Sequence, residues 1–174
     1  MAVHKIQVQP LTQEAFAKYG TVVDWPKNPD DYYAFHTDRF DFIPKLGTLN
    51  SDSGNMAVGI ATHFLRPYRM GNMERHYHTE ELMVPFEHPI ILAFAMNEGL
   101  DPKEEPDYTK VEAFLVNLNQ GVVVNTGVWH WTPFSVGGNA RVLCIFADKT
   151  GDDDCDIREF ANGEMLELCL PEQN

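Results

Sequence analysis

Positively charged residues are scarce in this chain, which has 13 Lys and Arg residues against 26 Asp and Glu residues and a formal net charge of −13. Nucleic acids and anionic membranes are bound by basic surfaces. We therefore expect neither nucleic acid nor membrane as a partner. A small anionic substrate would need local positive charge, which a bound metal ion and a nearby arginine such as Arg75 could supply.

Cysteines are also few. The three, Cys144, Cys155 and Cys169, form no C-x-x-C pair, and an odd number suits a reducing compartment better than a disulfide framework. Apolar runs of membrane-spanning length are missing, and the first residues lack the apolar segment of a secretory signal. These absences predict a cytoplasmic protein.

Helical signals are confined to one segment near the N-terminus. Thr12 is a suitable N-cap and Gly20 a suitable stop, so we predict one short helix over residues 13–19. The acidic segment 97–107 is expected to be a solvated hairpin loop. Alternating or apolar segments between turn-forming residues predict strands at residues 5–9, 21–23, 32–35, 40–43, 57–64, 73–78, 81–86, 90–96, 110–116, 122–125, 130–135 and 141–147.

Many short strands at this spacing indicate an all-β sandwich or barrel. No linker with a shift in composition interrupts the chain, so we expect a single domain over residues 1–174.

Two histidines, His76 and His78, are separated by one residue inside a predicted strand. Side chains at this spacing point to the same side of a β-strand. A third imidazole, His130, follows much later in the chain, and the three could hold one divalent metal ion. The alternative is an exposed strand that happens to be rich in histidine.

The segment that leads to His130 is similar to the second conserved box of the cupins. It contains Gly121, a turn at Asn125 to Gly127, and then Trp129 and His130. The turn would direct His130 into the barrel towards the first pair, while Trp129 packs in the core. This resemblance implies a cupin-like β-barrel, that is, a double-stranded β-helix or jelly roll, with one short N-terminal helix.

Glu81 is the candidate for a carboxylate ligand. It lies closer to the histidine pair than the usual cupin glutamate, so it is either a ligand or a neighbour of the ligands, and Glu80 fits a turn residue better. Imidazoles with one carboxylate suit nickel, manganese, iron or zinc, and the ligand set alone does not choose among them.

The chain also carries a series of short motifs in a fixed order: Glu74-Arg75-His76, Pro85, Gln120-Gly121-Val122, Val128-Trp129-His130, Asp148 and Cys155-Asp156. Together with the N-terminal segment 8–20, these motifs resemble the ureidoglycolate lyase family, also called ureidoglycolate hydrolase. The resemblance implies a cupin-like barrel, commonly a homodimer, that splits ureidoglycolate into glyoxylate and urea.

Departures from the family pattern lie near the expected pocket. Glu81 stands where the family has Gln, Asn125 where it usually has His, and Lys149 where it has Arg, while His78 replaces an apolar residue. We expect Asn125 and Lys149 to bind the substrate. We also expect Glu81 and His130 to take part in catalysis, with Glu81 as the base if it is not a ligand.

Two alternatives remain open at this point. His78 and Glu81 would complete a more ordinary cupin metal site, which favours a metal-dependent isomerase, decarboxylase or dioxygenase acting on another small oxyacid, sugar or enediol. The other alternative is a non-catalytic barrel that binds a small molecule.

Overall fold

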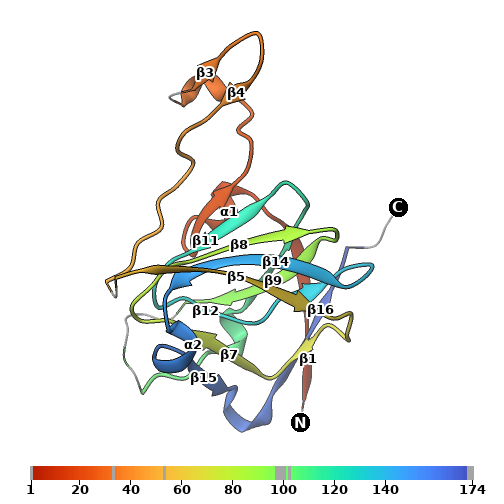
Figure 1. The fold of residues 1–174 in the computed structure, drawn as a ribbon. Coiled ribbons are helices and arrows are strands. Elements are labelled where there is room, and N and C mark those ends of the chain that lie inside the picture. Colours follow the sequence, from red (N-terminus) through yellow and green to blue (C-terminus); the bar gives the residue numbers. More distant parts are fainter. Residues whose placement is uncertain (1, 33, 53, 97–100, 102, 172–174) are drawn as a thin grey trace.

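The computed structural model describes residues 2–32, 34–52, 54–96, 101 and 103–171, which are mostly in β-strands (Figure 1). The strands are β1 (Val3–Pro10), β2 (Gly20–Val23), β3 (Phe35–His36), β4 (Asp41–Phe42), β5 (Met56–His63), β6 (Arg69–Met70), β7 (Asn72–Arg75), β8 (Glu81–Phe86), β9 (Ile90–Ala95), β10 (Glu112–Val116), β11 (Gly121–Val124), β12 (Trp129–His130), β13 (Phe134–Ser135), β14 (Ala140–Ala147), β15 (Asp156–Glu159) and β16 (Met165–Cys169). The helices are α1 (Gln13–Phe16) and α2 (Thr150–Asp153), with short 3-10 turns at Pro29–Asp31, Tyr108–Lys110 and Ala161–Gly163.

Two sheets form the body of the molecule. The larger sheet has the order β15-β7-β12-β9-β10-β1-β16-β6, with β13 also paired to β9. The smaller sheet has the order β2-β11-β8-β14-β5. One hydrophobic core combines residues of both sheets, such as Phe94 and Phe114 of the larger with Met83 and Val142 of the smaller. The core therefore lies between the sheets, as in a cupin-like β-barrel, and the predicted fold class is confirmed.

Strand β9 shows how the larger sheet is buried on both faces. All six of its residues are buried, and they are apolar without interruption. Because side chains alternate along a strand, Leu92 and Phe94 enter the core between the sheets, whereas Ile91 and Ala93 enter a second core on the opposite face. Because β12 is hydrogen-bonded to this buried strand, it is held next to the centre of the barrel.

The predicted N-terminal helix exists but is shorter than expected. Thr12 is its N-cap, with the hydroxyl oxygen accepting a hydrogen bond from the amide of Ala15 at 3.1 Å. The helix ends at Phe16, which is buried in the core, and the chain reaches β2 through Tyr19. A second short helix, α2, was not predicted. No helix in the described ranges is long and apolar enough to cross a membrane.

The strand predictions need correction in several places. Of the strand predicted over residues 32–35, only Phe35 belongs to a strand among the described residues, as the first residue of β3, and β6 was not predicted. The strand predicted over residues 73–78 is β7, which ends at Arg75. The strand predicted over residues 130–135 is divided into β12 and β13. The C-terminal β15 and β16 were missed, although β16 pairs in parallel with β1. The predicted hairpin loop over residues 97–107 falls partly outside the described residues.

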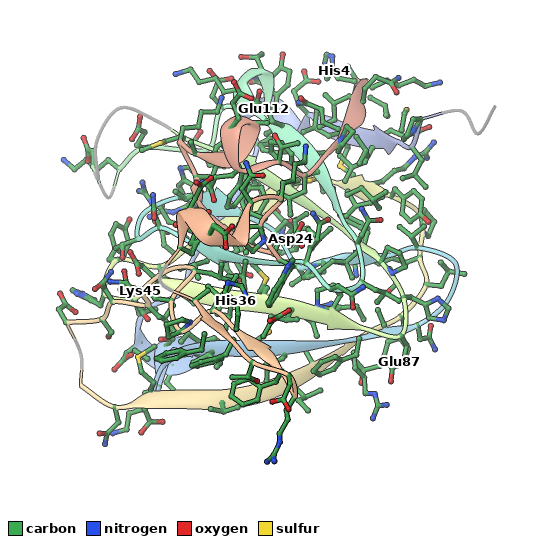
Figure 2. All side chains as sticks on the ribbon, turned by 90° about the horizontal axis from the view of Figure 1, so that it is seen from above. His4, Asp24, His36, Lys45, Glu87 and Glu112 are labelled. Atoms are coloured by element: carbon green, nitrogen blue, oxygen red, sulfur yellow. The ribbon has the colours of Figure 1, made fainter. Side chains whose placement is uncertain are left out.

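Between β2 and β5 the chain leaves the body as a long arm, which carries the small hairpin of β3 and β4 at its end (Figure 1). Figure 2 looks down on this region, with Asp24, His36 and Lys45 labelled along it. In the hairpin, Phe35 pairs with Phe42 across the strands and the two rings stack at 6.2 Å. No residue of the arm belongs to either core cluster, so its apolar side chains are not buried in the core of this chain.

Candidate metal centre

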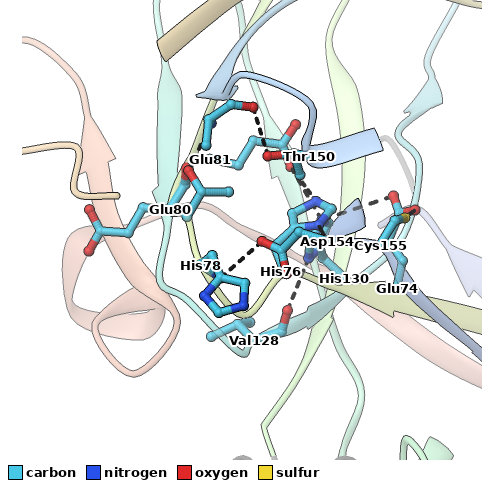
Figure 3. Close-up of polar contacts among 12 residues, drawn as sticks. Glu74, His76, His78, Glu80, Glu81, Val128, His130, Thr150, Asp154 and Cys155 are labelled. Atoms are coloured by element: carbon cyan, nitrogen blue, oxygen red, sulfur yellow. Dashed lines mark hydrogen bonds and ion pairs between the residues drawn. The ribbon is translucent and has the colours of Figure 1, made fainter. Parts of the chain in front are cut away.

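Three buried side chains converge inside the barrel, two from residues 76–81 and one from the distant β12 (Figure 3). His76 directly follows β7, Glu81 is the first residue of β8, and His130 is the last residue of β12. Each of them offers one ligand atom, and these atoms all lie within 4.8 Å of one another. The group could therefore hold a metal ion.

Glu81 lies between the two imidazoles. Its Oε2 is 3.3 Å from Nε2 of His130 and 3.8 Å from Nε2 of His76. Nε2 of His130 is buried, and among the described residues it has no hydrogen-bond partner of suitable geometry, in spite of this close carboxylate. A buried ring nitrogen without a partner is costly, and coordination of a metal ion would satisfy it.

The other nitrogen of each ring is held by the backbone. Nδ1 of His76 lies 2.6 Å from the carbonyl oxygen of Asp154, and Nδ1 of His130 lies 3.0 Å from that of Val128. Because a carbonyl oxygen can only accept, each Nδ1 carries the hydrogen and donates it. The Nε2 lone pair of each ring is then directed towards Glu81. Two imidazoles oriented by their second nitrogen, with one carboxylate, fit a divalent metal ion.

Electrostatic contacts keep the buried Glu81 charged. Burial alone would raise the pKa of Glu81, but its contact with His130 and the proximity of His76 outweigh burial and lower the pKa. Burial alone would lower the pKa of His130, and the contact with Glu81 raises it instead. The site therefore contains an ionised carboxylate, which is the form that binds a metal.

Asp154 positions His76 and was not found from the sequence. Its carbonyl oxygen accepts from the His76 ring, while its carboxylate accepts hydrogen bonds from the backbone amides of Tyr77 at 2.7 Å and His78 at 2.9 Å. Asp154 is buried in the connection between α2 and β15. No spacing signal in the sequence distinguishes it from Asp152 and Asp153 beside it.

The prediction that His78 shares a strand face with His76 is wrong. Strand β7 ends at Arg75, and the residues after it form a bend, so the alternation of side chains no longer applies. The imidazole of His78 is largely exposed, and its Nδ1 lies 3.1 Å from Oδ2 of Asp52. This hydrogen bond raises the pKa of His78. The structure thus places His78 apart from the three converging residues.

Arg75 is buried and makes several contacts, although its Nη1 has no hydrogen-bond partner among the described residues. Its guanidinium forms an ion pair with Asp156 at 3.3 Å and lies against the rings of Tyr77 and Trp129, at 4.9 and 4.2 Å from their centroids. A carboxylate thus already neutralises its charge. These contacts fit a structural role better than attraction of an anionic substrate.

Asn125 and Lys149 are both exposed. Asn125 follows β11 in a turn, where its carbonyl oxygen accepts from the amide of Val128 and where Gly127 has a positive φ of 79°. Lys149 precedes α2 with a φ of 70°. The predicted turn is present, and the roles of Asn125 and Lys149 in substrate binding stay predictions.

Two thiols border the site. The thiol of Cys155 donates to Oε2 of Glu74 at 3.3 Å, and Oε1 of Glu74 lies 4.0 Å from Nε2 of His130. Burial and the negative charge of Glu74 raise the pKa of Cys155 to about 12. Burial and the charge of Glu81 raise the pKa of Cys144 to about 12 as well. Both thiols are thus protonated near neutrality and are poor nucleophiles.

The family described as ureidoglycolate lyase matches residues 3–167. The chain belongs to the ureidoglycolate lyase family. It is accordingly an enzyme of the lyase type. Ureidoglycolate lyases from Escherichia coli O1:K1 / APEC and from E. coli O81 (strain ED1a) are each 27% identical to it over 165 residues, covering 92% of this chain and 98% of the relative.

Two solved structures are similar at a lower level. The TDP-fucose-3,4-ketoisomerase WlaRA from Campylobacter jejuni matches with a TM-score of 0.45 and 8% identity, over 78% of this chain and 86% of that one. RmlC from Streptococcus suis, in complex with dTDP-D-xylose, matches with a TM-score of 0.43 and 10% identity, over 75% and 72%.

The three converging residues and His78 should differ in a metal-binding experiment. Loss of an outer hydrogen-bond partner typically costs about 10–100-fold in metal affinity, so loss of a ligand in His76→Ala or His130→Ala should cost at least that. Elemental analysis after dialysis, followed by metal titration, measures the effect. His78→Ala is the matched control and should keep the metal content of the unchanged protein. Equal metal loss in the His78 variant would contradict this assignment.

The raised pKa of Cys155 predicts unusually slow alkylation. The thiolate is the reactive form, and a pKa of about 12 leaves far less thiolate at mildly alkaline pH than an ordinary cysteine has. In chelator-treated protein, we expect Cys155 to react with iodoacetamide on the order of a thousand-fold more slowly than in urea-unfolded protein. The rate should increase with pH and in Glu74→Gln, as followed by mass spectrometry. Alkylation at the unfolded rate would refute the Glu74–Cys155 contact.

Proposed function

We propose that this enzyme cleaves the carbon–nitrogen bond of ureidoglycolate, giving glyoxylate and urea, with a divalent metal ion held by His76, Glu81 and His130. Membership of the family supports the reaction. The convergence of two backbone-anchored imidazoles on one buried carboxylate supports the metal, and it is the observation on which the proposal depends. Nickel, manganese, iron and zinc all suit this donor set.

The reaction needs one proton to be removed and one to be returned. The hydroxyl group of ureidoglycolate loses its proton as the carbonyl group of glyoxylate forms. The carbon–nitrogen bond breaks with its electron pair going to nitrogen, and that nitrogen takes up a proton to leave as urea. No oxidant or reductant is required. A bound metal ion would lower the pKa of the hydroxyl group by Lewis acidity.

Glu81 is the carboxylate ligand in this proposal, because it lies between both imidazoles. Glu74 is the next carboxylate, with Oε1 4.0 Å from Nε2 of His130. We assign to Glu74 the removal of the hydroxyl proton and its return to the leaving nitrogen. The Cys155 thiol holds the second oxygen of Glu74 by a hydrogen bond and so orients the carboxylate.

Arg66 is our candidate for binding the carboxylate of the substrate. Its guanidinium is half-buried and donates to the carbonyl and hydroxyl oxygens of Thr132, two residues after His130. Among the described residues it forms no ion pair with a carboxylate, although acidic residues are abundant. An arginine in this state can bind an anion in the fork geometry that suits a carboxylate.

His63 is electrostatically coupled to both Arg66 and Glu81. Its Nε2 is buried without a hydrogen-bond partner among the described residues. Burial lowers the pKa of His63, Arg66 lowers it further, and Glu81 acts in the opposite direction, so His63 lies within electrostatic range of both. This electrostatic coupling supports the proposal that Arg66 and His63 lie near the group that would hold the metal.

The alternative function, a metal-dependent enzyme that acts on another small oxyacid or sugar, is now less well supported. It was favoured because His78 and Glu81 together would complete an ordinary cupin metal site, and His78 lies outside the converging group. Glu81 alone still favours it. Detection of glyoxylate and urea distinguishes the two functions.

Two carboxylate variants should separate metal binding from chemistry. Metal-loaded protein should release glyoxylate and urea from ureidoglycolate in a colorimetric assay. Glu81→Gln should lose both metal and turnover, because a neutral amide is a poor ligand. Glu74→Gln should keep the metal and lose about 100-fold or more in kcat, the usual cost of a lost acid–base group. Metal-loaded protein without glyoxylate release would refute the proposed reaction, and full activity of Glu74→Gln would refute the role of Glu74.

The role of Arg66 has its own kinetic test. Hydrogen bonds to charged groups are worth about 1.5–3 kcal/mol, so Arg66→Ala should raise KM for ureidoglycolate about 10–100-fold, with a smaller effect on kcat. The control is Arg69→Ala, since Arg69 is exposed and paired with Glu167. An unchanged KM in Arg66→Ala would exclude it as the carboxylate anchor.

A further inference from the structure

Two of the motifs found in the sequence lie opposite each other across one strand pair. In the register of β7 with β15, Arg75 pairs with Asp156, and Cys155 directly precedes Asp156. Because side chains alternate along β7, Glu74 and Arg75 face opposite sides of the larger sheet. Glu74 meets Cys155 on the side of His130 (Figure 3), whereas Arg75 meets Asp156 on the other side. Arg75 and Asp156 therefore lie behind the group that would hold the metal.

The space behind this group is occupied by the second hydrophobic core. Met73 of β7 and Trp129 of β12 both belong to that core, and Arg75 shares the strand face of Met73. The guanidinium of Arg75 lies over the Trp129 ring, with Cζ 4.2 Å from the ring centroid. A guanidinium is attracted to the face of an aromatic ring, and more strongly where water is excluded. Both side chains are fully buried, so this stack joins β7 to β12 inside the protein.

Backbone pairing between β7 and β12 is minimal. Strand β12 has only two residues, and its register with β7 in the described structure consists of the single pair His130 and Glu74. His76 directly follows β7 and His130 ends β12, and their ring centroids lie 5.1 Å apart. One backbone pair fixes the separation of two strand ends poorly. The stack of Arg75 on Trp129 therefore contributes to the distance between the two imidazoles.

Tyr77 extends this arrangement to the other side of His76. Its hydroxyl donates to Oδ2 of Asp156 at 2.6 Å, and the same oxygen accepts from Nε of Arg75 at 3.3 Å. The ring of Tyr77 also lies against the guanidinium, 4.9 Å from Cζ to the centroid. The two residues that flank His76 in the sequence are thus joined through one carboxylate. His76 cannot move relative to β12 without disturbing these contacts.

Asp156 is ionised and has a further partner. Burial alone would raise the pKa of Asp156, but hydrogen bonds from Tyr77, Arg158 and Arg75 outweigh burial and lower the pKa. Nε of Arg158 donates to the second carboxylate oxygen, Oδ1, at 2.6 Å. Asp156 would thus keep two hydrogen-bond donors if the guanidinium of Arg75 were removed.

The stack is not arranged for stability alone. Nη1 of Arg75 and Nε1 of Trp129 are buried and have no hydrogen-bond partner in the part of the chain that the structure describes. A buried donor without an acceptor is costly. A buried ionic group can often be replaced by an apolar side chain of similar volume without loss of stability, as long as no partner is left unpaired. Loss of the guanidinium should therefore affect the geometry of the site more than the stability of the fold.

We propose that Arg75 is a positioning residue, which sets the separation of the His76 and His130 imidazoles. It does so from behind, by stacking on Trp129 and by sharing a carboxylate with Tyr77. In this role Arg75 touches neither the substrate nor the metal. The inference rests on the proposed metal site, because the two imidazoles are its ligands, but the order of the rings can also be measured without any metal.

Metal-free protein tests the positioning directly. The Nδ1 hydrogens of His76 and His130 are held by backbone carbonyls, so they should give slowly exchanging imidazole N–H signals in NMR spectra of isotope-labelled protein. Arg75→Met keeps an unbranched apolar side chain over the tryptophan. We expect both signals to exchange about 10-fold faster or more in this variant, since local opening becomes easier, with little change in the thermal unfolding midpoint. Arg158→Met is the matched control, because it removes the other arginine from the same carboxylate and should leave both signals unchanged.

Cobalt(II) titration measures the consequence for metal binding. The visible absorption of this ion reports its affinity and its coordination geometry together. Arg75→Met should lower the affinity about 10–100-fold, as does the loss of an outer partner of a metal ligand, and should change the shape of the visible bands. Tyr77→Phe removes a single hydroxyl group and should lower the affinity about 10-fold. It takes the place of Arg75→Met in both experiments if that variant does not fold.

Two results would overturn the proposal. One is unchanged imidazole exchange together with unchanged cobalt affinity in folded Arg75→Met, or in Tyr77→Phe in its place. The other is an equal loss in Arg158→Met, which would assign the effect to the charge of Asp156 instead of the stack. If the unchanged protein binds no cobalt, the proposed metal site is wrong, and the imidazole signals alone decide the role of Arg75.

Discussion

The hydrogen bonds from the Nδ1 atoms of His76 and His130 to backbone carbonyls are the interactions on which the site depends. They fix the tautomer of each ring and direct each Nε2 towards Glu81. The two carbonyl groups belong to different parts of the fold, Val128 next to β12 and Asp154 after α2. The barrel thus supplies the orientation, and the imidazoles supply the donors.

Burying the charge of Glu81 would be unfavourable without these rings. An ionised carboxylate in a protein interior is stable only when it is paired or bound to a metal. Here two imidazoles lie beside it, and their contacts lower its pKa in spite of burial. The same site leaves Nε2 of His130 without a suitable hydrogen bond in the described structure. Glu74 lies near the same nitrogen and accepts a hydrogen bond from the thiol of Cys155, and in our proposal it exchanges the proton while Arg66 binds the anion.

Much of this arrangement could be predicted from local pattern. Residues 81–86 and 90–96 with their turn formers predicted β8 and β9 almost to the residue. Strand β9 is apolar throughout because both of its faces are buried, whereas the burial of β8 alternates along the strand. The turn at Asn125 and Gly127 and the burial of Trp129 were also predicted from the residues of that segment.

His78 was misplaced because side chains alternate between the two faces only while the backbone is extended. The carboxylate of Asp154 binds the amides of Tyr77 and His78 and belongs to the bend that ends the strand, and a contact across 76 or 77 residues leaves no local pattern. That Arg66 has no carboxylate partner among the described residues could not be predicted for the same reason, since it depends on which carboxylates the fold brings near.

The central claim is that His76, Glu81 and His130 form one metal site without His78. Anomalous diffraction from crystals soaked in zinc or nickel salts tests it most directly. The account predicts one strong peak inside the barrel at about 2.0–2.2 Å from Nε2 of both imidazoles and from a carboxylate oxygen of Glu81. A peak bound by His78 and Asp52 instead, with none among the three buried residues, would contradict it.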